Sequence, residues 1–215
     1  MISNTPILVR VVAVGVGLAL WFWTQKLISR KATPGTGVGD RLHDWSAPLH
    51  AWLKANPGAA NLTLIITSAL IDAVGLYLLG SAIFGPSLRP FVAILILFGL
   101  RQICQAISNL PKPPDMIWRH PGFPSLLVTY STSNDFFFSG HTAVAVLGAI
   151  ELAYNGPQGL AFVVAVIALV EAATVIVLRA HYTTDVFAAI FTAWGAEITA
   201  QRIAPAIDAW LQRLV

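Results

Sequence analysis

Two short segments carry the residue types that acid–base and nucleophilic chemistry needs. Residues 135–141 read Asp-Phe-Phe-Phe-Ser-Gly-His, and residues 179–185 read Arg-Ala-His-Tyr-Thr-Thr-Asp. His181 and Asp185 are four residues apart, so a helix that contains both places them on one face. A carboxylate bonded to one imidazole nitrogen fixes the tautomer and leaves the other nitrogen free to attack or to take a proton. We therefore expect His141, His181 and Asp185 to be catalytic.

Arginines near these histidines point to phosphorus chemistry. Arg179 lies two residues before His181, and a guanidinium matches phosphate oxygens in a bidentate way. A histidine can also carry a phosphoryl group as a covalent intermediate. Arg101 lies within an apolar segment, where its charge requires a partner. Phosphate binding and a structural pair with Asp72 or Glu171 both meet that requirement.

The composition is that of an integral membrane protein. Hydrophobic residues make up 56% of the chain and charged residues 11%, against about 25% charged in soluble domains. The net charge of +3 is spread over connectors between apolar segments, which fits topology and headgroup contact rather than nucleic-acid binding. The single cysteine, Cys104, allows neither an intrachain disulfide nor a cysteine metal site.

The apolar segments predict an all-α membrane protein, a bundle of about six transmembrane helices forming a single domain over residues 1–215. The expected spans cover about 7–28, 60–84, 88–110, 139–154, 158–178 and 183–203. We expect the first to be retained, because no small-residue cleavage site follows it. Between the first two spans, residues 41–54 mix apolar and charged side chains at near-helical spacing, which predicts a short interfacial helix.

Alternating span direction places both histidines on one side of the membrane. The ends of the first, third and fifth spans share that side with the starts of the second, fourth and sixth. The basic residues of this side favour the cytoplasm, whereas its long connectors weaken that inference. The compartment stays open, and so does the oligomeric state.

The residues of both segments resemble a known enzyme superfamily. Residues 139–142, Ser-Gly-His-Thr, and 181–186, His-Tyr-Thr-Thr-Asp-Val, are similar to the motifs of the type 2 phosphatidic acid phosphatase superfamily. Within it, the likeness is to the transferase branch, which resembles sphingomyelin synthases and plant phosphatidylcholine:diacylglycerol cholinephosphotransferases. Arg179 matches that branch's Arg-x-His-Tyr-Thr-x-Asp pattern, and Arg101 its arginine-bearing helix before a Leu-Pro-x-Pro turn. The resemblance covers about residues 40–200.

Two departures separate the chain from the phosphatase branch. Phosphatases carry Pro-Ser-Gly-His, and here Phe138 stands in place of the proline. Their third motif has an arginine six residues before the second histidine, where this chain has Val175. The resemblance is therefore to a headgroup transferase more than to a phosphatase.

The resemblance implies a role for each residue. His181 would attack the phosphorus of a phospholipid, with Asp185 orienting it. His141 would protonate the leaving diacylglycerol oxygen and then deprotonate the acceptor hydroxyl. Arg179 and Arg101 would balance the phosphoryl charge. No metal and no cofactor is implied.

Three further residues are predicted to bind substrate. Ser139 belongs to the first histidine motif. Tyr182 can make a cation–π contact with a choline group, assisted by Asp135, although interfacial anchoring explains the tyrosine equally well.

The function we expect is transfer of a phospho-headgroup, phosphocholine above all, from a glycerophospholipid to diacylglycerol or a ceramide-like acceptor. Both lipids would bind from the bilayer. Two alternatives stay open: a lipid phosphatase on the same scaffold with water as acceptor, and a non-catalytic protein that binds or scrambles lipids.

Overall fold

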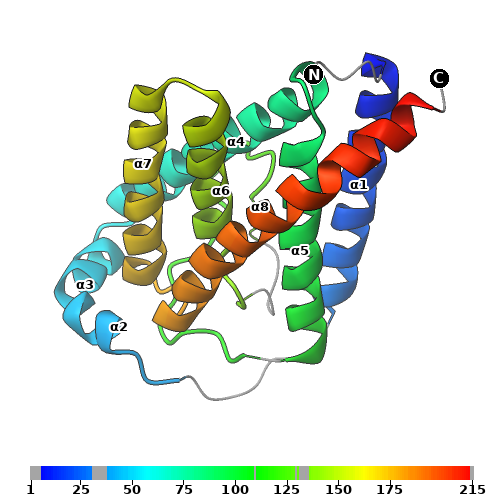
Figure 1. The fold of residues 1–215 in the computed structure, drawn as a ribbon. Coiled ribbons are helices and arrows are strands. Elements are labelled where there is room, and N and C mark those ends of the chain that lie inside the picture. Colours follow the sequence, from blue (N-terminus) through cyan, green and yellow to red (C-terminus); the bar gives the residue numbers. More distant parts are fainter. Residues whose placement is uncertain (1–5, 31–37, 109, 129, 131–135, 214–215) are drawn as a thin grey trace.

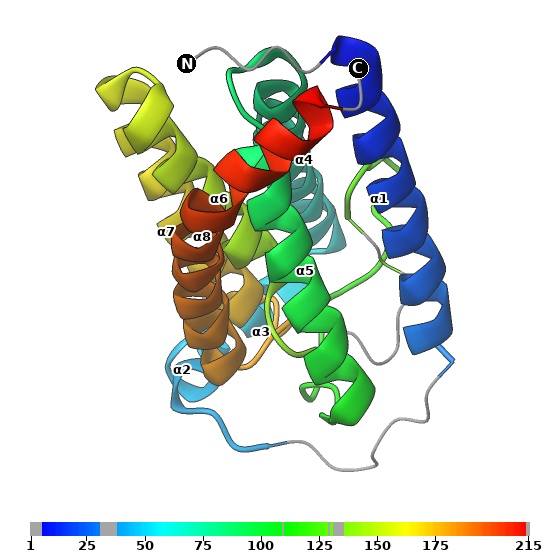
Figure 2. The same cartoon turned by 45° about the vertical axis from the view of Figure 1, so that its right-hand side comes forward.

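The computed structural model describes residues 6–30, 38–108, 110–128, 130 and 136–213, and these residues form helices and connecting loops without any strand. Two views are shown in Figures 1 and 2. The helices are α1 (Ile7–Ile28), α2 (Arg41–Trp45), α3 (Ala47–Ala55), α4 (Pro57–Phe84), α5 (Arg89–Ile107), α6 (Gly140–Asn155), α7 (Gln158–Val177) and α8 (Thr183–Gln212).

Prolines and glycines set most helix boundaries. Pro57 and Pro90 lie in the first turns of α4 and α5, where a missing N–H costs no hydrogen bond. Gly85, followed by Pro86, ends α4, and Gly156, followed by Pro157, separates α6 from α7. The predicted spans therefore match helices, except that the last helix continues beyond residue 203 to Gln212.

Chain direction brings the two histidine motifs to one end of the bundle. In Figure 1, α1, α5 and α7 run downward and end near the bottom, whereas α6 and α8 begin there and run upward. The short helices α2 and α3 lie at the same end, beside the end of α7. We call this the α2–α3 end. It contains the start of α6 with His141 and the loop before α8 with His181.

Small residues allow the central helices to pack closely. One face of α8 carries alanines that are at most 1% exposed, at positions 189, 193, 196, 200 and 204. This face packs against α5 and α6. Gly148 of α6 lies against α4, where an added Cβ would come within 2.3 Å of Val74 Cγ1. Close backbone approach of this kind is how helices associate inside a bilayer.

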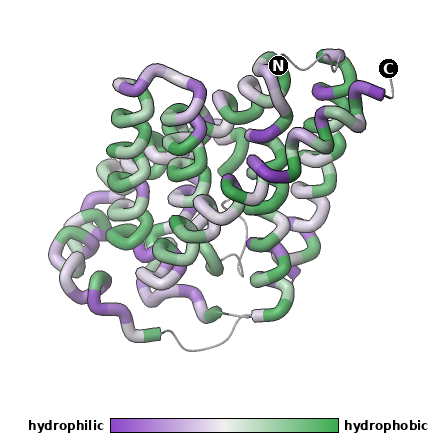
Figure 3. The backbone as a smooth tube through the Cα atoms, viewed as in Figure 1, coloured by the Kyte–Doolittle hydropathy of each residue, from purple (hydrophilic) through white to green (hydrophobic). Residues whose placement is uncertain are grey.

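By length and composition, the described part of the chain contains four helices able to cross a membrane: α1, α4, α5 and α7. Figure 3 shows them as largely hydrophobic, whereas hydrophilic residues lie at α2 and α3 and also at helix ends, in the connectors and along α8. The other two predicted spans differ in length and polarity. α6 has 16 residues, and α8 carries Glu197, Arg202 and Asp208. The prediction of six spans and of an interfacial location for α2 and α3 stays a prediction.

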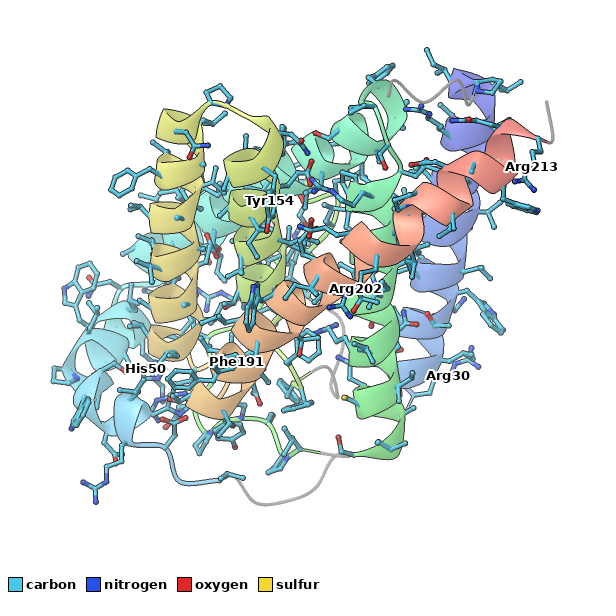
Figure 4. The ribbon with its side chains drawn as sticks, in the orientation of Figure 1. Arg30, His50, Tyr154, Phe191, Arg202 and Arg213 are labelled. Atoms are coloured by element: carbon cyan, nitrogen blue, oxygen red, sulfur yellow. The ribbon has the colours of Figure 1, made fainter. Side chains whose placement is uncertain are left out.

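A charged cluster ties three helices together at the opposite end. Arg89 at the start of α5 forms ion pairs with Glu151 of α6 and with Glu197 of α8, the latter at 3.2 Å. Its guanidinium also lies 5.3 Å from the centre of the Tyr154 ring, which is labelled in Figure 4. These buried carboxylates are therefore paired packing residues.

Candidate active site

His181 lies in the loop that joins α7 to α8. Arg179, directly after the helix end, has a left-handed backbone with φ of 53°. The N–H groups of Ala180 and His181 both donate to the carbonyl of Val175, at 2.8 and 3.3 Å, which closes a tight turn. Because α8 begins only at Thr183, His181 precedes the helix. A single helix therefore does not hold both residues, and the condition for stacking His181 and Asp185 on one helix face is not met.

A backbone carbonyl is the hydrogen-bonding partner of His181. Its Nδ1 atom lies 2.9 Å from the carbonyl oxygen of Phe136 and 3.6 Å from Asp185 Oδ2. A carbonyl only accepts, so Nδ1 carries the proton and Nε2 keeps its lone pair. The Asp185 carboxylate is fully buried and accepts the N–H of Tyr182 at 2.9 Å. It therefore caps α8 while its negative charge lies near the imidazole.

His141 occupies the first turn of α6 and is 7% exposed. Its ring contacts Trp118 edge to face, with ring centres 5.2 Å apart. Among the described residues, its Nε2 atom has no hydrogen-bond partner. A buried nitrogen without a partner is costly unless a ligand completes it.

Direct hydrogen bonds join the two motifs. Besides the bond between His181 and Phe136, the backbone N–H of Ser139 donates to the backbone carbonyl of Asp185 at 3.2 Å. The start of α6 is therefore fixed against the start of α8. Motifs that are 40 residues apart in sequence form one unit.

Both histidines line one large pocket. The space between its lining atoms, together with the open solvent at its entrance, amounts to about 1040 Å³. Apart from the histidines, its polar lining comes mainly from Arg101 and Gln25. Apolar side chains of α1, α4, α5, α6 and the segment 118–128 form the rest. The pocket thus has a polar end at the histidines and a long apolar part, as a lipid requires.

Arg101 supplies the positive charge of this pocket. It is 4% exposed, and its Nε donates to the carbonyl oxygen of Phe138 at 2.7 Å. Its guanidinium packs against Gly140, where an added Cβ would lie 3.7 Å from Arg101 Cζ. The Asp72 carboxylate, one partner considered for it, instead accepts the backbone N–H groups of Leu126 and Leu127.

The structure places three other predicted substrate residues outside the pocket lining. Arg179 donates from Nη1 to the carbonyl of Pro114 at 3.3 Å, because its left-handed backbone directs the side chain to that connector. The Tyr182 hydroxyl accepts the N–H of Val38. Ser139 caps α6 by accepting the N–H of Thr142. Asp135, the remaining predicted residue, lies outside the described residues.

Sequence reasoning missed two histidines of α2 and α3 that support the loop between α7 and α8. His43 of α2 lies 2.9 Å through Nε2 from the carbonyl oxygen of His181, and it stacks on Tyr182 at 5.6 Å. His50 of α3, labelled in Figure 4, lies 2.8 Å through Nδ1 from the carbonyl oxygen of Val177. Their spacing of seven residues, which would put both on one face of the single helix expected over residues 41–54, was the available signal, although they lie on two short helices.

Asp40 connects this support to α8. Its carboxylate caps α2 by accepting the N–H of Leu42 at 2.9 Å, and it accepts both the N–H and the hydroxyl of Thr183, at 2.5 and 2.7 Å. Partial burial raises the pKa of Asp40. The hydrogen bonds from Thr183 and the nearby His43 outweigh this effect and hold the pKa below its ordinary value.

In the described part of the chain, no three histidine, cysteine or acidic side chains cluster in a way that could hold a metal ion. The candidate site consists of two histidines and an arginine that line a mainly apolar pocket, with the buried Asp185 carboxylate 3.6 Å from His181 Nδ1.

Comparison with known proteins identifies the family. The family model described as AtPDCT1/2 matches residues 42–202, which include both histidine motifs. Phosphatidylcholine:diacylglycerol cholinephosphotransferase 1 of Arabidopsis thaliana is 23% identical over 137 residues. That alignment covers 64% of this chain and 44% of the plant protein, so the chain spans less than half of its relative. No solved structure matches significantly. From the family match over most of its length, the chain belongs to the AtPDCT1/2 family.

Proposed function

We propose that the protein is an integral membrane lipid phosphotransferase. It moves phosphocholine, or a related phospho-headgroup, from a glycerophospholipid to diacylglycerol or a ceramide-like acceptor. The observation that carries the proposal is the shared pocket: His141 and His181 line one space that also contains Arg101 and continues as an apolar cavity. The activity for which the plant relative is named, cholinephosphotransferase, supports the same chemistry.

The first half-reaction is attack by His181 Nε2 on the phosphorus of the donor lipid. A bond forms between nitrogen and phosphorus, and the bond between phosphorus and the diacylglycerol oxygen breaks. His141 gives a proton to that oxygen, so that neutral diacylglycerol leaves. The Phe136 carbonyl keeps the Nδ1 proton of His181 in place, and the Asp185 carboxylate 3.6 Å away stabilises the positive imidazole.

The second half-reaction reverses these steps with the acceptor lipid. His141, now neutral, removes the proton of the acceptor hydroxyl, whose oxygen attacks the phosphorus. The nitrogen–phosphorus bond of His181 breaks, and the headgroup leaves on the acceptor. Arg101 offsets charge on the phosphoryl oxygens in both steps. No metal or cofactor takes part in this scheme.

We further propose that α6 and α8 cross the membrane together with α1, α4, α5 and α7, which makes six spans. The directions of the helices in Figure 1 support this, since they alternate along the chain. We also propose that the chain belongs to the type 2 phosphatidic acid phosphatase superfamily and is related to sphingomyelin synthases. The two histidine motifs support this assignment.

Hydrolysis is the alternative on the same scaffold, and one experiment separates the two. The purified protein in nanodiscs receives phosphatidylcholine labelled in its phosphocholine group, together with diacylglycerol of a distinct acyl composition. Transfer predicts labelled phosphatidylcholine with the new acyl chains, and a His181→Ala control predicts none. Label that appears only in water-soluble products would overturn the transferase proposal.

A further inference from the structure

Helix α1 lies outside the matched family region, yet it contributes to the pocket. The family match begins at residue 42, whereas α1 ends at Ile28. In Figures 1 and 2, α1 runs beside α5, and the two helices are in contact. Trp21 and Gln25 of α1 line the same pocket as the two histidines. A helix that acts only as an anchor has no need of polar groups there.

Gln25 is an unusual residue for such a helix. Most side chains of α1 are exposed, whereas Gln25 is only 4% exposed. Its amide oxygen accepts hydrogen bonds from Arg101 Nη1 and from Trp21 Nε1, both at 3.2 Å, in the orientation that turns the oxygen toward these donors. The reverse orientation would set an NH₂ group against two donors. Burial of an amide in an apolar helix is costly unless such bonds compensate it.

These contacts fix the guanidinium of Arg101 from two sides. The Phe138 carbonyl accepts from Nε at 2.7 Å, and Gln25 accepts from Nη1. Trp21 braces Gln25 in turn, and its ring packs on Phe98 of α5 at 5.0 Å. Gln25 withdraws no charge from Arg101, because a neutral acceptor leaves the guanidinium its full positive charge for an anionic ligand.

We infer that Gln25 is a positioning residue for Arg101, and that α1 thereby belongs to the phosphate-binding part of the site. The inference rests on the proposed function in assigning a lipid phosphate to Arg101. A glutamate at position 25 would hold the arginine but neutralise it, and an apolar residue would remove the hydrogen bond to Nη1. Glutamine does neither, which accounts for its presence near the end of an otherwise apolar segment.

A double-mutant cycle tests the inference. The probe is a phosphonate analogue of phosphatidylcholine that cannot react, and its affinity is measured at equilibrium in neutral detergent. Gln25→Leu is expected to weaken binding about tenfold, the loss of one hydrogen bond to a charged group. In an Arg101→Gln background the same change is expected to have less than about a twofold effect, because the group it positions is gone. Equal losses in both backgrounds, or no loss at all, would overturn the inference.

Thr24→Ala is the matched control. Thr24 neighbours Gln25, but its hydroxyl donates to the carbonyls of Leu20 and Trp21 in its own helix. Binding is expected to stay unchanged in this variant. If Arg101→Gln does not fold, steady-state kinetics decide. Gln25→Leu should raise the KM for the phosphate-bearing donor and leave that for diacylglycerol unchanged, and a rise in both would contradict positioning.

Failure of this inference differs from failure of the proposed function. If Gln25→Leu weakens phosphonate binding only when Arg101 is present, but the wild type transfers no headgroup, the transferase proposal fails and Gln25 remains a positioning residue. Transfer by a Gln25→Leu variant with wild-type donor affinity would retain the transferase and reject the role of Gln25. A wild-type protein that does not bind the phosphonate would reject the inference.

Discussion

His181 and Phe136 form the hydrogen bond that links the two histidine motifs, with Nδ1 of the ring 2.9 Å from the backbone carbonyl oxygen. No substitution of the Phe136 side chain removes this acceptor, so the tautomer of His181 is built into the backbone. The Asp185 carboxylate lies farther from the same nitrogen, at 3.6 Å. We expected the Asp185 carboxylate both to orient the His181 ring and to stabilise its positive charge. In the structure the Phe136 carbonyl orients the ring, and the carboxylate is left to stabilise the charge.

This division predicts a graded response to substitution. Asp185→Asn keeps a side-chain oxygen that can cap α8 and leaves the bond from His181 Nδ1 to the Phe136 carbonyl in place, while it removes the charge. We expect kcat to fall by about 10- to 100-fold, which corresponds to about 1.4–2.7 kcal/mol of lost charge stabilisation in the transition state. His141→Gln removes the general acid and should cost about 10²–10⁴-fold. Headgroup-transfer rates with labelled phosphatidylcholine measure both, and a larger loss for Asp185→Asn than for His141→Gln would contradict the division.

The two arginines near the site are predicted to differ. Arg101 lines the pocket, whereas the Arg179 side chain reaches the carbonyl of Pro114. Arg101→Lys should reduce kcat/KM about 10²-fold, because a lysine keeps the charge but loses the fork geometry. Arg179→Lys should change it less than about threefold, as an exposed contact contributes little. The same transfer assay measures both variants, and a reversed order would place Arg179 at the phosphate.

The apolar part of the pocket predicts selectivity for acyl-chain length. Leu78 of α4 lines the pocket and is fully buried, so Leu78→Trp should shorten the space. The ratio of rates for short-chain over long-chain donors should rise about tenfold, with some loss of stability from overpacking. Leu76→Trp is the control on the same helix, since Leu76 is 53% exposed. An equal loss for all chain lengths would show that the acyl chains bind elsewhere.

Asp40 predicts a dependence of stability on pH. Its pKa in the folded protein lies below the ordinary value, so its contribution is present above the unfolded-state pKa and is lost as the pH falls through the folded-state value. Asp40→Ala should lower stability by about 1 kcal/mol near neutral pH, as expected for a lost helix cap. Thermal unfolding in detergent between pH 7 and about pH 3 should show wild type and Asp40→Ala converging at the acidic end. If the difference in stability between wild type and Asp40→Ala stays constant with pH, the charge of the Asp40 carboxylate does not contribute to stability.

Much of the helix layout was predictable from sequence, because apolar runs and proline or glycine breaks define it locally. The first span was predicted at residues 7–28, and α1 covers Ile7–Ile28. The end of the last helix was missed, since Pro205 lies within α8 and does not end it. The number of spans stays a prediction, because length and composition mark four of the helices as membrane-crossing.

The candidate site was less predictable, because backbone geometry decides where its side chains lie. The left-handed turn at Arg179 keeps His181 out of α8 and directs the arginine away from the pocket, and no residue type announces it. Gln25 and Asp40 lie far from the motifs in sequence, and only the folded chain brings them to the site. Of the four predicted substrate-binding residues that the structure describes, Arg101 is the one that lines the pocket.

The most direct test of the account is to detect the covalent intermediate. Wild-type protein is mixed with phosphatidylcholine in the absence of acceptor, quenched at alkaline pH, where phosphohistidine survives, and digested for mass spectrometry. The account predicts a phosphocholine adduct on the peptide that contains His181, absent in His181→Ala and discharged when diacylglycerol is added. Rapid transfer without any adduct, or an adduct on His141, would contradict it.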